Sequence, residues 1–262
     1  MPKSQGYVSA EYLRKAAQQI GFLKERSYEL MDIKPGAVLL DAGCGAGMDT
    51  VPLANFIGDS GRVVGIDIDE EMLQKADRHA EQEGVARIVE HKLADVAALD
   101  FADDSFDAIR AERLFQVLPE SVNAETVLAE LVRVTKPGGA IVLLDADWGT
   151  FSVDFSNSEL ERRLMTFFAS QMRPNGFAGR QMYAWGQRAG LQNISMESAP
   201  LIQTDYEQAP VGPWLQVEAV KAGIATQQEV DDWATELLAR NEQGQFYCSV
   251  NMMLLSAVKS EL

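Results

Sequence analysis

The stretch VLLDAGCGAG, residues 38–47, decides the fold of this chain. Three apolar residues lead into an acid, Asp41, and glycines follow at positions 43, 45 and 47. The apolar run predicts a buried parallel strand. Glycine lets the backbone turn sharply and approach a ligand, because no Cβ stands in the way. A helix expected from about Met48 would direct its N-terminus at the same place, so the stretch predicts a nucleotide-type cradle.

The spacing of the glycines argues against two common nucleotide loops. The dinucleotide pattern G-x-G-x-x-G needs a glycine at position 48 or 50, where Met48 and Thr50 stand. A phosphate-binding loop needs a Gly-Lys-Ser/Thr ending, which this stretch lacks. What remains is Asp-x-Gly-x-Gly-x-Gly, whose acid repels a pyrophosphate and suits a cationic ligand group.

Two further stretches accompany this pattern: FDAIRAERLFQVL at residues 106–118 and AELVRVTKPGG at residues 129–139. The ordered set resembles the class I S-adenosylmethionine-dependent methyltransferases, in particular their ubiquinone and menaquinone biosynthesis branch. The resemblance covers residues 36–147 well and the rest poorly. It implies S-adenosylmethionine as the cofactor and S-adenosylhomocysteine as the product. This cofactor carries an ammonium and a sulfonium and has no phosphate.

The length and composition of the chain limit its class. A chain of 262 residues, 47% of them hydrophobic, predicts one domain with a sizeable core. No apolar run reaches the roughly 18 residues of a membrane span, and the N-terminus lacks a signal-peptide core, so a cytoplasmic protein is expected. The net charge of −16 disfavours nucleic acid and anionic membranes as partners. Two cysteines, Cys44 and Cys248, predict neither a disulfide framework nor a metal site, and the oligomeric state stays open.

Strands and helices alternate along the first part of the chain, which predicts βαβ units and a parallel sheet. With the resemblance, this becomes an α/β, doubly wound, mostly parallel seven-stranded Rossmann-like sheet of order 3-2-1-4-5-7-6. We expect a single domain over residues 1–262, made of a helical lid (1–35), a cofactor-binding core (36–147) and cap insertions with the last strands (148–262). The expected strands are 37–41, 62–67, 86–92, 106–111, 140–145, 192–201 and 246–258, and the expected helices are 9–31, 48–57, 70–83, 123–135, 179–189 and 227–240.

An acid follows the second expected strand, about 20 residues past the glycines. Ligands bind at the carboxyl edge of such sheets, so Asp67 is predicted to accept the ribose hydroxyls. A simple turn residue is the alternative. If Asp67 binds the ribose, Ile68 is predicted to pack against one face of the adenine. Asp69 is predicted to cap the next helix.

The resemblance supplies the remaining cofactor positions. It implies that Asp95 takes the adenine amino group and that the Val96 backbone N–H serves a ring nitrogen, although Asp95 could instead cap a short helix at 96–99. Arg113 is predicted to pair with the cofactor carboxylate, Glu112 or Asp147, with a surface arginine as the alternative. The predicted cofactor-binding set is Asp41, Gly43, Cys44, Gly45, Gly47, Asp67, Ile68, Asp95, Val96, Ala111, Glu112, Arg113 and Gln116.

Catalytic residues are less clearly marked. Glu112 and Asp147 are candidate general bases, because some acceptors must lose a proton. Gln116 stands where many members of the resembled family carry a histidine, and the two histidines of the chain, His79 and His91, fall away from the cofactor edge. Aromatic residues are candidates to line a substrate pocket, with packing of a cap as the alternative: Tyr12, Trp148 and Tyr183, and more weakly Trp185 and Trp214.

The predicted function is methyl transfer from S-adenosylmethionine to a small-molecule acceptor that is flat or apolar, by in-line displacement in a closed pocket. Three alternatives remain at this stage: a non-catalytic cofactor-binding module, a transferase that uses a modified cofactor, and an RNA methyltransferase.

Overall fold

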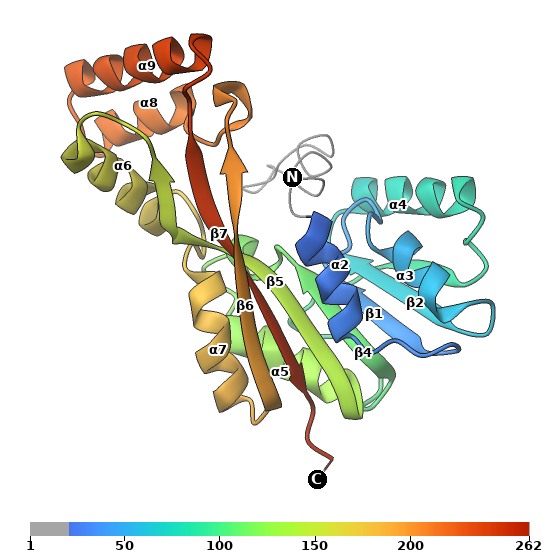
Figure 1. Ribbon diagram of the computed structural model, residues 1–262. Coiled ribbons are helices and arrows are strands. Elements are labelled where there is room, and N and C mark those ends of the chain that lie inside the picture. Colours follow the sequence, from blue (N-terminus) through green and yellow to red (C-terminus); the bar gives the residue numbers. More distant parts are fainter. Residues whose placement is uncertain (1–20, 262) are drawn as a thin grey trace.

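The computed structural model describes residues 21–261 and contains one seven-stranded sheet with helices on both faces (Figure 1). The strand order is β3-β2-β1-β4-β5-β7-β6, and β7 runs antiparallel to both of its neighbours, so the predicted fold class is confirmed. The strands are β1 (Val38–Ala42), β2 (Arg62–Asp67), β3 (Val89–Leu93), β4 (Phe106–Glu112), β5 (Thr135–Val153), β6 (Gln192–Gln203) and β7 (Cys248–Val258).

The predicted helices are present within the described residues with end shifts of a few residues, whereas α6 and α8, both in the cap region, were not predicted individually. Thr226 and Glu229 form the capping box of α9, and Asp69 accepts from the backbone N–H groups of Glu71 and Met72 at the start of α4, as predicted. The helices are α2 (Gly21–Leu30), α3 (Thr50–Ile57), α4 (Glu70–Gln82), α5 (Ala124–Val134), α6 (Ser158–Gln171), α7 (Ala178–Arg188), α8 (Pro213–Lys221) and α9 (Gln227–Glu242), with short 3-10 turns η1 (Phe115–Val117) and η2 (Tyr206–Gln208).

Two apolar cores lie on the two faces of the sheet, because successive side chains of a strand point to opposite sides. Leu39 of β1 belongs to the core beneath α2, α3 and α4, whereas Leu40 belongs to the core beneath α5 and α7. Both side chains are fully buried. This double burial explains why β1 appears in the sequence as an unbroken apolar run.

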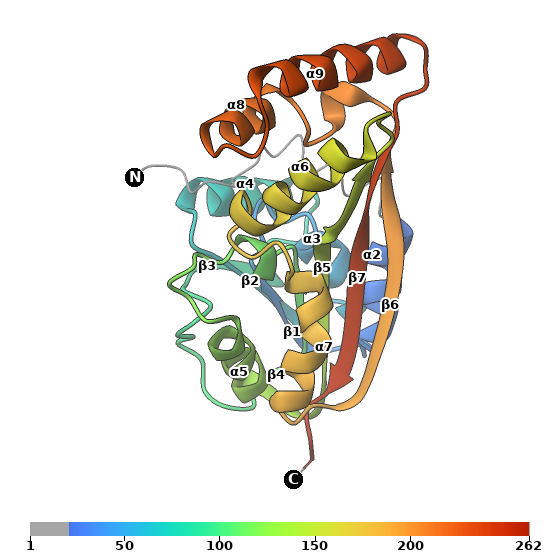
Figure 2. The ribbon, with the colours of Figure 1, turned by 90° about the vertical axis from the view of Figure 1, so that its left-hand side faces the viewer.

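The strand β5 is much longer than the predicted 140–145. It begins at Thr135, runs through the Pro137-Gly138-Gly139 turn signal and continues to Val153. Its pairing with β7 is interrupted between Asp147 and Ser152, where the register shifts, and then resumes. The prolonged β5, β6 and β7 form an arm that carries α6, α8 and α9 away from the core sheet (Figure 2). The predicted break after Asp147 is therefore a bulge inside one long strand.

The helix α2 is attached to the far end of the sheet. The guanidinium of Arg26 bonds the carboxylate of Glu197 on β6, with Nη2 2.8 Å from Oε1. The predicted helix over 9–31 and the predicted lid (1–35) are described only from Gly21, and Tyr12 lies outside the described residues. Within residues 21–261, no helix is both long and apolar enough to cross a membrane.

Candidate active site

The glycine loop leaves the carboxyl end of β1 as a series of left-handed turns. The φ angles of Gly43, Gly45 and Gly47 are +75°, +53° and +74°, a region that L side chains rarely adopt. Gly47 also lies against α4, where an added Cβ would stand 2.9 Å from the Cβ of Ala76. Both the backbone angles and the packing therefore require glycine at this position.

Replacement of Gly47 by alanine is expected to destabilise the protein and to weaken cofactor binding together. The new methyl group must adopt a strained φ and push α4 away, at a cost of about 1–3 kcal/mol. Urea unfolding with and without S-adenosylhomocysteine measures both effects. Gly45→Ala is the matched control, because a Cβ there meets nothing within 4 Å and adds only the φ strain. Equal losses in both variants would contradict the packing argument.

The N–H groups of the glycine loop are mostly used inside the protein. Gly43 and Cys44 donate to the carbonyl of Ile66, Gly45 donates to the Asp67 carboxylate, and Gly47 donates to Cys44. The start of α3 holds an acid, Asp49. A diphosphate site needs free N–H groups and a helix N-terminus without a negative charge. Here most loop N–H groups are already bonded, and Asp49 places a carboxylate at the helix start.

Asp67 supports the glycine loop from the end of β2. Its Oδ2 accepts from Gly45 N at 2.9 Å, and its Oδ1 accepts from Asp69 N at 2.9 Å. Burial raises the pKa of the Asp67 carboxyl, while these backbone bonds oppose the rise. Each carboxylate oxygen has a second lone pair, so both remain able to accept a ligand hydroxyl.

Apolar side chains stand exposed at the same edge of the sheet. Ile68, directly after β2, is 72% exposed, and Leu93, the last residue of β3, is 57% exposed. Large side chains exposed side by side at a ligand edge are typical of a binding surface. Leu93 was not predicted as a site residue, although its place two residues before Asp95 at the end of β3 could have indicated it.

Asp95 lies in the turn that follows β3. Its Oδ1 accepts from Ala97 N at 2.8 Å, which is the local capping bond considered as the alternative. The residue is exposed, whereas Val96 beside it is buried. The turn therefore directs the carboxylate to solvent at the edge that also carries Ile68.

A buried ionic cluster lies behind the glycine loop, and the sequence analysis missed it. Arg110 of β4 is fully buried, with Nη1 3.1 Å from Asp49 Oδ2 and 3.8 Å from Asp41 Oδ1. The same guanidinium donates a hydrogen bond to the Glu112 carboxylate. Its Nε also donates to Ser27 Oγ of α2 at 3.0 Å. Lys24 and Tyr28 of α2 also bond Asp49, and Lys24 lies 3.5 Å from Glu112.

The cluster sets the ionisation of its two most buried acids in opposite directions. Burial and the charge of Asp49 raise the pKa of Asp41 to about 7, against the pull of Arg110. Burial would also raise the pKa of Glu112, but the cations Arg113, Arg110 and Lys24 outweigh it and hold that pKa at about 2. Among the described residues, Oδ2 of Asp41 is buried and has no hydrogen-bond partner. The cluster therefore leaves two buried atoms without a hydrogen bond: the acceptor Oδ2 of Asp41, in the glycine loop, and the donor Nη1 of Arg110, which lies within ion-pair distance of Asp49.

Arg113 and Gln116 follow β4 and meet different partners. Arg113 has a φ of +53° and pairs with Glu112, with Nη2 3.0 Å from Oε1, which is one of the predicted pairings. Gln116 is buried, and its Oε1 accepts from the indole Nε1 of Trp148 at 2.6 Å. Ala111 and Cys44 are buried at the same edge.

The predicted pocket residues divide into two buried ones, Trp148 and Trp185, and two partly exposed ones, Tyr183 and Trp214. Trp148 is 5% exposed and packs against Phe151 and Phe168 in the cap. Tyr183 is exposed on α7, where its hydroxyl accepts from Gln187. Trp185 packs against Phe115, and Trp214 against Phe168.

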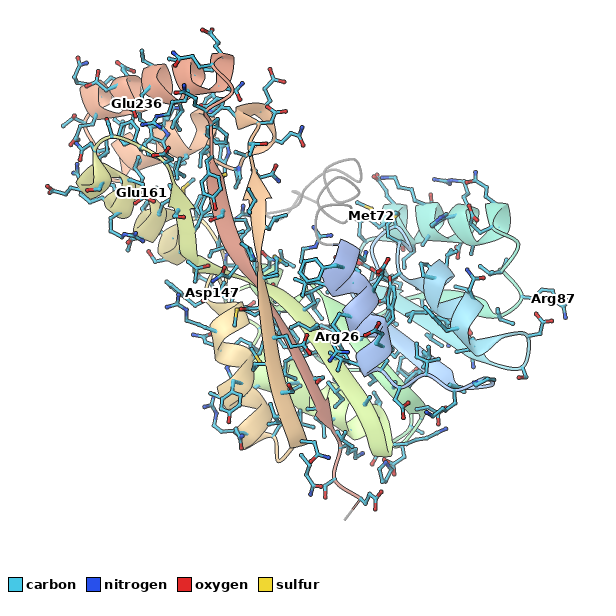
Figure 3. The ribbon with its side chains drawn as sticks, viewed as in Figure 1. Arg26, Met72, Arg87, Asp147, Glu161 and Glu236 are labelled. Carbon is cyan, nitrogen blue, oxygen red and sulfur yellow. The ribbon has the colours of Figure 1, made fainter. Side chains whose placement is uncertain are left out.

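Asp147 lies where β5 leaves the core sheet for the arm (Figure 3). Both of its oxygens accept from Nε of Arg180 on α7 at 2.8 Å. Its side chain is almost fully buried in this pair. A carboxylate held in this way orients α7 against β5.

The histidines lie next to the glycine loop, contrary to the sequence-based expectation that both are remote from it. His79 Nδ1 is 3.1 Å from the carbonyl oxygen of Gly47, and His91 Nε2 is 3.0 Å from the hydroxyl of Thr50. The expectation failed because helix α4 is rich in charge and appears solvated in sequence, whereas His79 is on its inner edge and only partly exposed.

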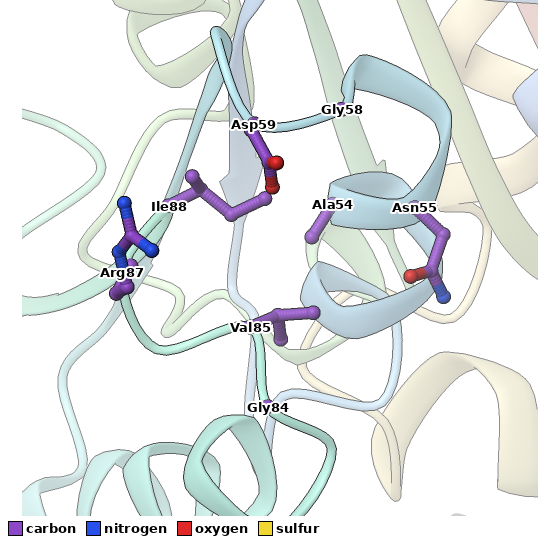
Figure 4. A pocket seen from close by; sticks show the side chains of 8 residues that line it. All are labelled: Ala54, Asn55, Gly58, Asp59, Gly84, Val85, Arg87 and Ile88. Atoms are coloured by element: carbon purple, nitrogen blue, oxygen red, sulfur yellow. The ribbon is translucent and has the colours of Figure 1, made fainter.

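A cavity of about 190 Å³ opens elsewhere, between the end of α3 and the loop before β3 (Figure 4). Asp59 and Arg87 stand at its rim with Asn55 and Val85. It is at the amino ends of β2 and β3, the opposite edge from the glycine loop. Within residues 21–261, no group of three or more acidic, histidine or cysteine side chains is arranged to hold a metal ion.

The strand order, together with an acid-bearing glycine loop after β1, defines the class I methyltransferase fold. Residues 33–207 match the methyltransferase domain family. The solved structure of YcgJ from Bacillus subtilis superposes with a TM-score of 0.63 at 18% identity, covering 94% of this chain and 99% of that one. A geranyl diphosphate C-methyltransferase from Streptomyces coelicolor superposes with a TM-score of 0.58 at 15% identity, covering 99% and 89%.

Sequence relatives are similar over different lengths. An uncharacterised 37.1 kDa protein of a Streptomyces fradiae transposon is 31% identical over 87% of this chain and 64% of its own length. A demethylmenaquinone methyltransferase from Desulfitobacterium hafniense is 33% identical over 47% of both chains. This chain thus spans about half to two thirds of the length of these relatives. It belongs to the methyltransferase domain family, has the fold of the class I S-adenosylmethionine-dependent methyltransferases and resembles their menaquinone branch.

Proposed function

We propose that the protein transfers a methyl group from S-adenosylmethionine to a small, flat or apolar acceptor that binds beside the glycine loop. One observation carries the proposal: the loop offers a buried, unsatisfied carboxylate oxygen on Asp41 and few free N–H groups. An unpaired buried acceptor is costly, and an ammonium group relieves that cost. The residues present therefore fit an adenosyl cofactor with a cationic end.

The chain's own residues hold the cofactor in this proposal. Asp67 accepts hydrogen bonds from the ribose hydroxyls, and Ile68 and Leu93 pack against the adenine. Asp95 and the Val96 N–H form hydrogen bonds with the polar edge of the adenine. Asp41 faces the ammonium, and Arg113 stands near the methionine carboxylate. When bound, S-adenosylmethionine supplies an electrophilic methyl group, and the protein supplies alignment and exclusion of water.

Neither predicted base is well suited to remove a proton from the acceptor. Glu112 has a pKa of about 2 because Arg113, Arg110 and Lys24 outweigh its burial, so it is a very weak base. Asp147 is committed to Arg180 through both oxygens. We therefore propose an acceptor that ionises on its own, such as an aromatic ring bearing an acidic hydroxyl. The demethylmenaquinone methyltransferases among its relatives are named for a quinone, which is flat and apolar.

The affinity for S-adenosylhomocysteine is expected to rise with pH between 6 and 8. Burial raises the pKa of Asp41 to about 7. The fraction of Asp41 that is ionised, and so attracts an ammonium, therefore increases across this pH range. Titration of one group gives roughly a fivefold to tenfold gain, measured by calorimetry at each pH. Asp41→Asn should remove the dependence. The same shift makes the free enzyme lose stability as pH rises from about 4 to about 7, because the folded state binds the proton more tightly.

The acceptor class is tested by incubating the protein with labelled S-adenosylmethionine and a metabolite extract, followed by mass analysis of what gains a methyl group. Label in an aromatic hydroxylated compound supports the proposal. Label in RNA, or cofactor binding with no labelled product from any extract, would contradict it.

A further inference from the structure

Both histidines of the chain converge on one short segment of the glycine loop and the first turn of α3. His79 lies on α4 and His91 on β3. Two elements that come later in the sequence therefore contact the loop and the start of α3. Neither histidine belongs to the cofactor-binding set proposed above. The convergence calls for a role in shaping the loop.

The contacts form a continuous chain of polar groups. His91 Nδ1 is 2.8 Å from Asp77 Oδ1, His91 Nε2 is 3.0 Å from Thr50 Oγ1, and Thr50 Oγ1 donates to the carbonyl of Gly47 at 3.2 Å. His79 Nδ1 reaches the same carbonyl at 3.1 Å. A carbonyl oxygen has two lone pairs, so Thr50 and His79 together satisfy Gly47 completely.

The packing around this chain leaves little freedom. The His91 side chain is 1% exposed, and Thr50 is fully buried. Gly65 of β2 makes the space, because an added Cβ there would stand 2.8 Å from His91 Cδ2, 2.9 Å from Cys44 Sγ and 2.9 Å from Thr50 Cγ2. The glycine loop, α3 and β3 therefore pack closely against Gly65, where any larger residue would clash.

We propose that Thr50, His79 and the Asp77–His91 pair are positioning residues that fix the Gly47 carbonyl and so hold the glycine loop in its cofactor-binding conformation. The inference rests on the proposed cofactor site, since Gly47 closes the loop that begins at Asp41. Gly47 has a left-handed φ, and its peptide planes turn freely unless something holds them. Fixing this carbonyl keeps Gly45 N directed at Asp67, the carboxylate assigned to the ribose.

Thr50→Val tests the hydroxyl without changing the volume of the side chain. We expect the Kd for S-adenosylhomocysteine and the KM for S-adenosylmethionine to rise by about fivefold to tenfold, with kcat at saturating cofactor unchanged, since one hydrogen-bonded link to the loop is lost. Thr50→Ser keeps the hydroxyl and should stay within about twofold of the parent protein. Calorimetry and steady-state kinetics give the two constants.

His79 offers a second, independent pair of variants near the surface. His79→Asn keeps an N–H donor close to the Gly47 carbonyl and should bind S-adenosylhomocysteine like the parent, whereas His79→Leu should bind about fivefold more weakly. Glu81→Gln, on the exposed face of the same helix, is the matched control.

Thermal unfolding of the ligand-free variants separates positioning from folding. If Thr50→Val lowers the melting temperature but leaves the Kd unchanged, the residues only stabilise the fold and the inference is overturned. Weaker binding that serine and asparagine restore supports it. If the parent protein itself fails to bind S-adenosylhomocysteine, the proposed cofactor site is wrong, and this inference falls with it.

Discussion

Replacement of Asp67 by alanine is expected to raise the Kd for S-adenosylhomocysteine by about 100-fold or more. The carboxylate holds the backbone N–H of Gly45 and of Asp69, and in our proposal it also accepts the ribose hydroxyls. Hydrogen bonds to a charged group contribute about 1.5–3 kcal/mol each, so loss of the two ribose bonds alone accounts for a factor of this size. Calorimetry with the purified protein measures the change.

Two variants define how the Asp67 result is interpreted. Asp67→Asn keeps one acceptor oxygen without the charge, so it should fall between the parent and the alanine variant. Asp59→Ala makes the same truncation at the remote cavity of Figure 4 and should leave the Kd unchanged. An Asp67→Ala protein that binds as tightly as the parent would remove the ribose assignment.

The largest effect on stability is expected from Arg110→Met. The guanidinium is fully buried among Asp41, Asp49 and Glu112, and its removal leaves three acids with only Lys24 and Arg113 nearby. Breaking a buried ionic cluster by removing one partner costs about 3–5 kcal/mol. For a protein of this size, that lowers the melting temperature by roughly 10 °C.

Urea unfolding of Arg110→Met against Arg188→Met isolates the contribution of burial. Arg188 forms an ion pair with Glu125 at the surface, where both side chains are about half exposed, and such pairs contribute about 0–1 kcal/mol. The two variants remove the same charge from different environments. A similar small loss in both would show that the cluster behind the glycine loop is well hydrated.

The sequence predicted those parts of the fold and site that depend on local pattern. The apolar run of β1 and the alternate glycines are contiguous, and Asp67 ends the next strand about 20 residues later, so each is recognised within a short stretch of sequence. The start of β5 was predicted too late because Pro137, Gly138 and Gly139 normally interrupt regular structure, whereas here their turn is held by pairing with Lys259 beyond β7.

The parts that were missed are assembled from distant segments. The Arg110 cluster draws on α2, β1, the start of α3 and β4, and no window of sequence contains it. One signal was available: an arginine inside the buried strand Phe106–Glu112 must have acidic partners. No comparable signal marks His79, whose contact with Gly47 depends on the rotation of α4.

The cap and the proposed cofactor site lie on different halves of the sheet. The strands β5, β6 and β7 carry the cap as an outgrowth, while Asp41, Asp67 and Asp95 belong to the opposite half of the sheet. The exposed surfaces of α6, α8 and α9 therefore lie along the sheet from Asp41, Asp67 and Asp95, the residues that we propose bind the methyl donor. With this separation, we expect the acceptor to change in evolution more easily than the methyl donor. Exchange of the cap between related proteins is expected to change the acceptor that is methylated.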